Sequence, residues 1–201
     1  YNLILGLNQT LISVKNFNFI KVDLTTKEST KDVINTVKPD IVINTVGLTN
    51  VDKCEKFPEN SKIANEIIPF NLASVCNEKN IIFVHISTDH LFDGRVKLAS
   101  ETEKVMPLNE YGKSKSKAEY FVKDNNPDSL IIRTNFFGWG TSYRQSFSDF
   151  IISKLKKSEK LFLFNDVYFT PIFVKNLIKY IYNLIEINSY GTFNIVSNDR
   201  L

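Results

Sequence analysis

The sequence is poor in glycine and in the residues that usually mark metal or redox sites. It has 7 glycines in 201 residues, and the only close pair is Gly138 and Gly140. It therefore contains no glycine-rich turn of the kind that holds a dinucleotide pyrophosphate on backbone amides. Cys54 and Cys76 match neither a metal-ligand spacing nor a redox pair, which fits a reducing cytoplasm. With 2 histidines and scattered acids, we expect no metal site.

Long apolar runs and an excess of one charge are also missing. No apolar run reaches the ~18 residues that a membrane helix needs. The chain opens without a basic, apolar leader, so we expect no signal peptide. The net charge is only +3, from 25 basic and 22 acidic residues. This balance predicts no nucleic-acid partner. The short apolar runs predict no membrane partner, and the cysteine usage predicts a cytoplasmic location.

The chain does carry enough apolar residues for a core, at 43% of the sequence, in a repeated order of strand and helix. We expect strands at 3–7, 19–22, 41–44, 80–86, 130–132 and 192–196, and helices at 29–37, 60–77, 109–123, 145–157 and 171–187. This alternation predicts an α/β protein with a doubly wound parallel sheet.

Local signals refine these expectations. Ser29 and Asn109 are predicted N-caps of their helices, and Pro69 should kink the helix at 60–77. The strand at 41–44 is apolar on both faces, which is typical of the middle of a covered sheet. His85 alternates within the next strand and is expected to be packed rather than catalytic.

The composition of the sequence changes near residue 135, where aromatic residues begin to cluster. The cluster could stack a nucleotide base or a sugar, or pack a core or a lid. Its members are Phe136, Phe137, Trp139, Tyr143, Phe147 and Phe150. We place a soft boundary here, between a domain at 1–135 and a smaller region at 136–201.

Tyr111 and Lys115 are four residues apart on the helix predicted at 109–123, so they share one face. A nearby ammonium group stabilises a phenolate, which lowers the tyrosine pKa and makes Tyr111 a competent acid and base. The spacing alone is weak evidence, because a surface lysine near a tyrosine is common in a chain with 8 tyrosines.

Thr88 strengthens this hypothesis. It leaves the carboxyl end of the apolar strand at 80–86, where open α/β sheets bind their ligands. Its hydroxyl could share a substrate oxygen with Tyr111. A serine or threonine, a tyrosine and a lysine in this order resemble the catalytic set of the short-chain dehydrogenase/reductase family.

Further segments resemble the extended branch of that family, which modifies nucleotide-linked sugars. They lie at 39–44, 51–55, 65, 86–94, 107–115, 132–135 and 170–171. The pattern is most similar to the group of dTDP-4-dehydrorhamnose reductases, and it runs through nearly all of the chain. The resemblance implies a Rossmann-like domain with part of a substrate-binding region, and reduction of a sugar ketone in cell-surface polysaccharide synthesis.

The resemblance also implies roles for individual residues. Tyr111 would protonate the substrate oxygen, Lys115 would lower the tyrosine pKa and bind the nicotinamide ribose, and Thr88 would orient the ketone. The cofactor, NAD or NADP, would lie along Asn8, Asp23, Leu24, Val46, Gly47, Leu48 and Lys115. The nucleotide-sugar substrate would meet Asp89, His90, Asn135, Phe136 and Thr170. Asn65 would support the site or be an ordinary polar residue of its helix.

Departures from the family pattern limit these expectations. The opening strand resembles the family's second strand, so we expect that the first strand, the glycine loop and the last helices lie outside this chain, and the activity of the chain alone stays open. Asn8 is neither the acid nor the base that selects between NAD and NADP. The pair Asp89-His90 replaces the Asp-Glu of sugar dehydratases, which disfavours dehydration.

Two alternatives remain at this point. The first is an NAD-dependent epimerase of nucleotide sugars, which consumes no net cofactor. The second is a non-catalytic, nucleotide-binding regulatory subunit of the same fold, which the absent glycine loop favours and the intact Thr88, Tyr111 and Lys115 oppose. The oligomeric state is open, with a homodimer as the state considered.

Overall fold

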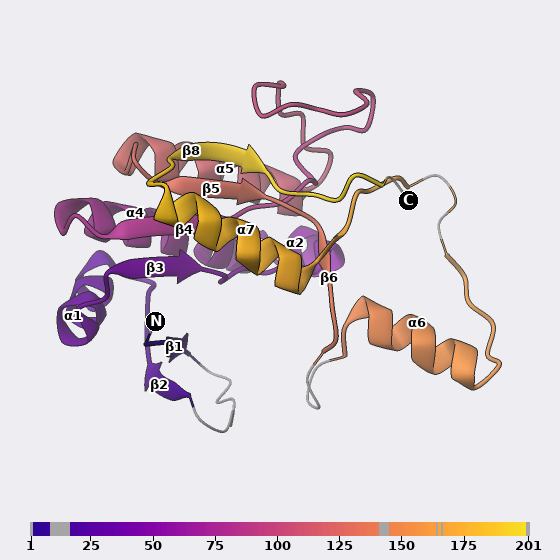
Figure 1. The fold of residues 1–201 in the computed structure, drawn as a ribbon, viewed down its shortest axis with the longest axis horizontal. Helices are drawn as coiled ribbons and strands as arrows, with labels where there is room; N and C mark the ends of the chain where they lie inside the picture. Colours follow the sequence, from indigo (N-terminus) through magenta and orange to yellow (C-terminus); the bar gives the residue numbers. More distant parts are fainter. Residues whose placement is uncertain (1, 9–16, 141–144, 164, 166, 200–201) are drawn as a thin grey trace. The chain divides into compact units, whose positions relative to one another are not determined.

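The computed structural model describes residues 2–8, 17–140, 145–163, 165 and 167–199. The chain divides into two compact units. Figure 1 labels helices and strands of both. The first contains Tyr1–His85 and Asn109–Ser129, and the second contains Ile86–Leu108 and Leu130–Leu201.

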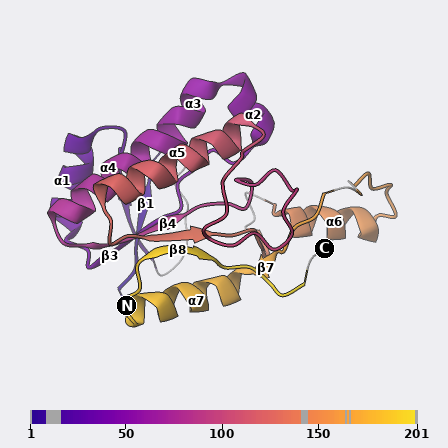
Figure 2. The same ribbon diagram turned by 90° about the horizontal axis from the view of Figure 1, so that it is seen from above.

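The first unit is built on parallel strand pairs. Strand β1 (Ile4–Leu7) pairs with β2 (Asn18–Lys21), and β3 (Ile41–Asn44) pairs with β4 (Ile82–Ile86). Its helices are α1 (Lys27–Val37), α2 (Val51–Lys56), α3 (Pro58–Lys62), the π-helix η1 (Ile63–Ile67), α4 (Ile68–Glu78) and α5 (Glu110–Asn125). These helices gather on one face of β3 and β4 (Figure 2). The predicted class, α/β with parallel strands, is confirmed.

The core of this unit forms where the apolar strand β4 meets α4 and α5. Phe83 of β4 is fully buried, as are Val75 of α4 and Val122 of α5. Burial of such side chains contributes roughly 1.5–3 kcal/mol each, which offsets the entropy cost of ordering the elements.

The helix predicted at 60–77 is instead three consecutive helical segments, α3, η1 and α4. Pro69 lies at the start of α4, where its missing N–H breaks the regular ladder. The N–H of Ile68 reaches back five residues to the carbonyl of Ile63, which makes the turn before it a π-turn. Such turns are rare and often lie at functional sites, and this one carries the buried Asn65.

Two other expectations for this unit were wrong. Helix α1 begins at Lys27 and is capped by Thr26, whose Oγ1 accepts the Ser29 N–H at 3.1 Å, so Ser29 is not the N-cap. Strand β3 is not in the middle of a sheet: among the described residues it pairs with β4 alone, and Ile43 is 39% exposed. The predicted cap at Asn109 is confirmed, because its Oδ1 accepts the Gly112 N–H at 2.8 Å.

The second unit also contains parallel pairs. Strand β5 (Leu130–Arg133) pairs with β8 (Gly191–Asn194), and β6 (Phe136–Phe137) pairs with β7 (Ile172–Phe173). Helix α7 (Val174–Glu186) directly follows β7, contacts β6, and buries Leu177, Ile181 and Ile185. Helix α6 (Phe147–Lys156) has a capping box between Ser146 and Asp149 and buries no residue. No helix in the described ranges is long and apolar enough to cross a membrane.

Candidate active site

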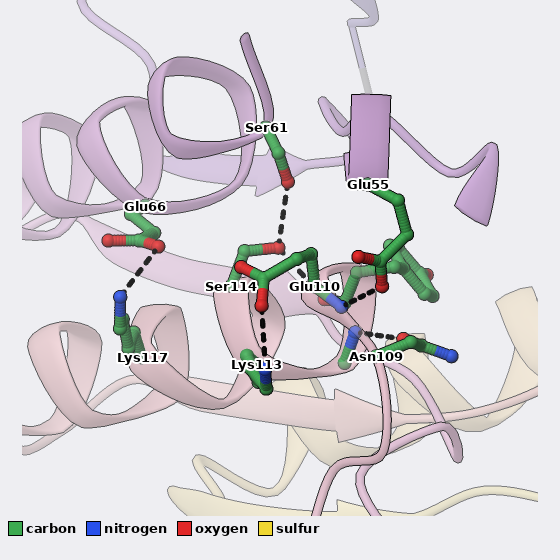
Figure 3. Close-up of polar contacts among 10 residues, drawn as sticks. Glu55, Ser61, Glu66, Asn109, Glu110, Lys113, Ser114 and Lys117 are labelled. Atoms are coloured by element: carbon green, nitrogen blue, oxygen red, sulfur yellow. Dashed lines mark hydrogen bonds and ion pairs between the residues drawn. The ribbon is translucent and has the colours of Figure 1, made fainter. Parts of the chain in front are cut away.

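The first turn of α5 holds Tyr111, and two side chains accept hydrogen bonds from the backbone amides of this turn. The Asn109 cap satisfies the Gly112 N–H, and Glu55 Oε1 of α2 accepts the Glu110 N–H at 2.8 Å (Figure 3). The first amides of a helix have no partner within the helix, so these two acceptors stabilise its start. Tyr111 is 8% exposed and sits in this braced turn.

Lys115 lies one turn further along α5 and is only 4% exposed. Its Nζ lies 3.2 Å from Nε2 of His85 in β4. Burial lowers the pKa of Lys115 to about 8, although Glu119 opposes this shift. Burial, and then the charge of Lys115, keep the pKa of His85 well below its usual value, so the imidazole is neutral.

The loop that leaves β3 contains the predicted cofactor residues Val46, Gly47 and Leu48, and the side chains of two asparagines hold its backbone. Asn44 Oδ1 accepts the Val46 N–H at 3.0 Å. Asn65 Oδ1 accepts the Leu48 N–H at 2.8 Å, and Asn65 Nδ2 donates to the Leu48 carbonyl at 3.1 Å. The loop therefore has a fixed shape while Val46 and Gly47 face outward, exposed.

Asn65 also connects this loop to α5. Its Nδ2 donates to Ser114 Oγ at 2.9 Å. Ser61 Oγ donates to the same oxygen at 3.1 Å (Figure 3). Ser114 Oγ in turn donates to the Tyr111 carbonyl at 2.8 Å. A buried polar chain thus runs from the β3 loop to the turn between Tyr111 and Lys115. Nearer the surface, Lys117 of α5 pairs with Glu66 of η1 at 3.5 Å.

Sequence reasoning missed Asn44, Ser61 and Ser114 as members of this arrangement, and it left Asn65 undecided. The available signal was weak: each is a polar residue at a position that faces other elements. Only the structure shows that they are buried and hydrogen-bonded, at 2%, 2% and 4% exposure for Asn44, Ser61 and Ser114.

The remaining predicted cofactor residues follow the other strands of the first unit. Asn8 is exposed where β1 ends. Asp23 follows β2, and its Oδ1 accepts the Thr25 N–H and hydroxyl at 2.9 and 2.7 Å, which lowers its pKa. The carbonyl of Leu24 accepts from Asn71 Nδ2 at 2.9 Å. The predicted residues Asn8, Asp23 and Val46 therefore all lie just beyond carboxyl ends of parallel strands, where such sheets bind ligands.

In the second unit, the loop after β4 brings two predicted substrate residues together. Asn135 Nδ2, just beyond β5, donates to Asp89 Oδ2 at 3.1 Å. Thr88 is 4% exposed, and its Oγ1 accepts the His90 N–H at 3.2 Å and lies 3.4 Å from Asp89 Oδ1. His90 itself is exposed.

The aromatic cluster lies beside a cavity of about 300 Å³ in the second unit. The cavity is lined by Phe137, Gly138, Trp139, Ser148, Ile151, Ile152 and Phe173. Phe136 is 52% and Trp139 67% exposed, so these rings are open to solvent, whereas Thr170 is half-buried. Tyr143 lies outside the described residues.

Comparison with known proteins places these features in a family. A protein from Haloferax volcanii named "probable low-salt glycan biosynthesis reductase" is 35% identical over 185 residues, which is 90% of this chain and 62% of that protein. The dTDP-4-dehydrorhamnose reductase of Salmonella typhimurium is 34% identical over 164 residues, or 77% of this chain and 54% of that enzyme. The chain thus spans just over half to three-fifths of these relatives.

A solved structure shows the same fold. The dTDP-4-dehydrorhamnose reductase of Bacillus anthracis, in complex with NADP, superposes with a TM-score of 0.84 at 27% identity, over 92% of this chain and 66% of that chain. This agreement confirms the predicted doubly wound α/β fold. The sequence profile of the family described as "RmlD substrate binding domain" matches residues 2–200. The chain therefore belongs to the RmlD substrate binding domain family.

Proposed function

We propose that the protein reduces a keto group on a nucleotide-linked sugar with NADPH or NADH, as a short-chain dehydrogenase/reductase. The observation that carries this proposal is the buried pair on α5, Tyr111 and Lys115, in a turn braced from two sides. A buried tyrosine and a lysine of lowered pKa on one helical face suit proton transfer near neutral pH.

The first unit fits a dinucleotide along the loop after β3. Gly47 presents no side chain there, and a Cβ at this position would lie 3.2 Å from Asn65 Oδ1. The loop is exposed, its backbone is fixed by Asn44 and Asn65, and Asn8 and Asp23 follow the neighbouring strands. These residues would hold the cofactor, which supplies a hydride when bound.

The residues of this chain would carry out the proton transfer to the substrate. Tyr111 would donate its phenolic proton to the ketone oxygen as that oxygen gains negative charge. Lys115, largely an ammonium at neutral pH with a pKa of about 8, would stabilise the phenolate that remains. Thr88, which belongs to the second unit, stays a residue predicted to orient the substrate oxygen.

The second unit carries the residues that we predicted to bind the substrate. Asp89 and Asn135 form a carboxylate–amide pair suited to sugar hydroxyls, and the exposed rings of Phe136 and Trp139 suit a nucleobase or a sugar face. His90 and Thr170 stay predicted substrate residues. The domain boundary near 135, a role in polysaccharide synthesis, a homodimer and a cytoplasmic location also stay predictions.

The test is oxidation of NADPH and NADH by the full-length protein, with a panel of nucleotide-linked keto sugars that includes dTDP-4-dehydrorhamnose. We expect stoichiometric cofactor consumption and a loss of turnover of about 100-fold or more in Tyr111→Phe. Tyr120→Phe is the matched control, because Tyr120 lies on the same helix and is 66% exposed. Normal turnover in Tyr111→Phe would overturn the proposal, and sugar conversion without cofactor consumption would indicate the epimerase instead.

A further inference from the structure

A row of three buried polar side chains crosses the first unit beneath the loop that follows β3. It contains Asn44 at the end of β3, His85 in β4 and Lys115 in α5, which are 2%, 0% and 4% exposed. Asn44 and His85 are directly opposite each other in the parallel register of β3 and β4. Asn44 Nδ2 lies 3.1 Å from His85 Nδ1, and His85 Nε2 lies 3.2 Å from Lys115 Nζ.

The direction of the first hydrogen bond follows from the backbone. The Val46 N–H can only donate, and it donates to Asn44 Oδ1 at 3.0 Å. The nitrogen of the Asn44 amide is therefore the atom that faces His85, and an amide nitrogen also only donates. His85 Nδ1 must accept, so its lone pair points at Asn44.

The tautomer of His85 is then determined. A neutral imidazole carries one proton, and with Nδ1 as the acceptor that proton is on Nε2. The Nε2–H points at Lys115 Nζ. An ammonium group has no lone pair to accept this hydrogen, whereas an uncharged amine has one. The contact is therefore favourable for the amine and unfavourable for the ammonium.

We propose that His85 is a positioning residue that acts through Lys115: Asn44 holds it in the Nε2–H tautomer, and this tautomer weakens the hold of Lys115 on its proton. The consequence for catalysis rests on the function proposed above, but the tautomer and the titration of Lys115 do not.

The other charged groups around α5 place this effect in context. Burial lowers the pKa of Lys115, and Glu119 one turn later on α5 opposes it. Glu66 of η1 pairs with Lys117, and Glu55 of α2 accepts the Glu110 N–H. On α4, Glu78 pairs with Lys27 and Lys31 of α1. His85 thus acts in the same direction as burial and against Glu119.

This arrangement would set the upper pH limit of the proposed reaction. Lys115 supports the Tyr111 phenolate only while it is charged, so activity should fall as Lys115 loses its proton. Because the Nε2–H tautomer of His85 favours the uncharged amine of Lys115, it moves this fall in activity to lower pH.

The first test reads the tautomer in the wild-type protein. The ¹⁵N NMR signals of the imidazole nitrogens report which nitrogen carries the proton, and the signals that are absent from the spectrum of a His85→Gln variant are those of His85. We expect His85 in the full-length protein to be neutral and protonated on Nε2 at neutral pH. An imidazolium, or a proton on Nδ1, would overturn the proposal.

The second test reverses the tautomer with Asn44→Asp. The carboxylate can still accept the Val46 N–H and can also accept from Nδ1–H, which moves the imidazole proton to Nδ1 and turns the Nε2 lone pair toward Lys115. We expect the titration of Lys115, followed by NMR of its side chain, to move to higher pH by about one unit. Asn77→Asp adds the same charge on an exposed position of α4 and should leave the titration unchanged.

The outcomes separate the two proposals. An unchanged Lys115 titration in Asn44→Asp overturns the coupling, as does a shifted titration with the imidazole proton still on Nε2, because the added charge would then be the cause. A shifted titration with the proton on Nδ1 supports the coupling. If the alkaline limit of reductase activity does not follow that shift, the coupling stands and the Tyr111–Lys115 chemistry of the proposed function fails.

Discussion

Asn65 binds both backbone polar groups of Leu48, with its Oδ1 accepting the N–H at 2.8 Å and its Nδ2 donating to the carbonyl at 3.1 Å. The two residues are 17 positions apart, and Asn65 is fully buried. This double contact holds the loop after β3 in place by a side chain that η1 supplies.

Replacing Asn65 with Asp should therefore damage both stability and cofactor binding. The carboxylate keeps the bond from the Leu48 N–H but loses the donor to the Leu48 carbonyl and to Ser114 Oγ. We expect a loss of about 2–3 kcal/mol in the free energy of unfolding and weaker NADPH binding. Urea unfolding and a binding titration measure these effects, and Asn60→Asp, an exposed position on α3, is the control. Wild-type values in Asn65→Asp would show that the loop is held by other contacts.

Gly47→Ala and Gly94→Ala should each lower the stability of the protein, for different physical reasons. At Gly47 the new Cβ would lie 3.2 Å from Asn65 Oδ1, whereas at Gly94 it would meet nothing but sit on a backbone with φ of +81°. Both variants should lose about 1 kcal/mol of stability. The loss at Gly47 should shrink in an Asn65→Ala background, because the clash disappears, while the loss at Gly94 should stay additive. A double-mutant cycle that is additive at Gly47 would contradict this account.

The burial of Lys115 should make stability depend on pH in a defined direction. Its folded-state pKa of about 8 is below the ordinary value of 10.5, so the unfolded chain binds more protons between these values. Burying the charged ammonium therefore lowers the stability of the folded protein. This loss of stability is fully present below pH 8 and is relieved as the pH rises from about 8 to 10.5. Removing the charge with Lys115→Met removes this loss.

We therefore expect the stability of Lys115→Met relative to wild type to fall by about 2 kcal/mol between neutral pH and roughly pH 9.5. Burial raises the pKa of Cys76 to about 12, so this thiol lowers stability as the pH rises above its ordinary value of 9.0. Both proteins contain Cys76, so its effect cancels in the difference between them. Denaturant unfolding at both pH values measures the difference, and a pH-independent difference would mean that Lys115 is not charged when folded.

The contact between Asp89 and Asn135 leads to a prediction about substrate affinity. Asn135→Asp places two carboxylates where an amide now donates to Asp89 Oδ2 at 3.1 Å. Repulsion should separate them and raise the KM for the nucleotide sugar by about tenfold, with a smaller change in kcat. Steady-state kinetics measure both constants, with Asn77→Asp as the charge control. A fall in kcat alone would instead place the pair near the reacting atoms.

The sequence determined the parts of this protein that depend on neighbours along the chain. Alternating apolar segments predicted the strands and helices, and Asn109 was recognisable as a cap because its partner is three residues away. The Tyr111–Lys115 pair was visible for the same reason, since helical spacing alone puts both on one face. One error was a local choice between equals, because Thr26 and Ser29 are both good caps and nothing in the sequence favours one. The position of β3 in its sheet was a different error, because it depends on strand pairing between distant residues.

What surrounds those residues depends on how distant parts of the chain pack together. His85 meets Asn44 across 41 positions and Lys115 across 30, so the contacts depend on the register of β3 and β4 and on where α5 packs. The π-turn that buries Asn65 likewise depends on how the chain accommodates Pro69. Hydrogen bonds between distant residues leave no periodic trace in a sequence, because each partner alone is an ordinary polar residue. The chemistry of Lys115 was therefore readable as a residue type, whereas its proton affinity is a property of the folded environment.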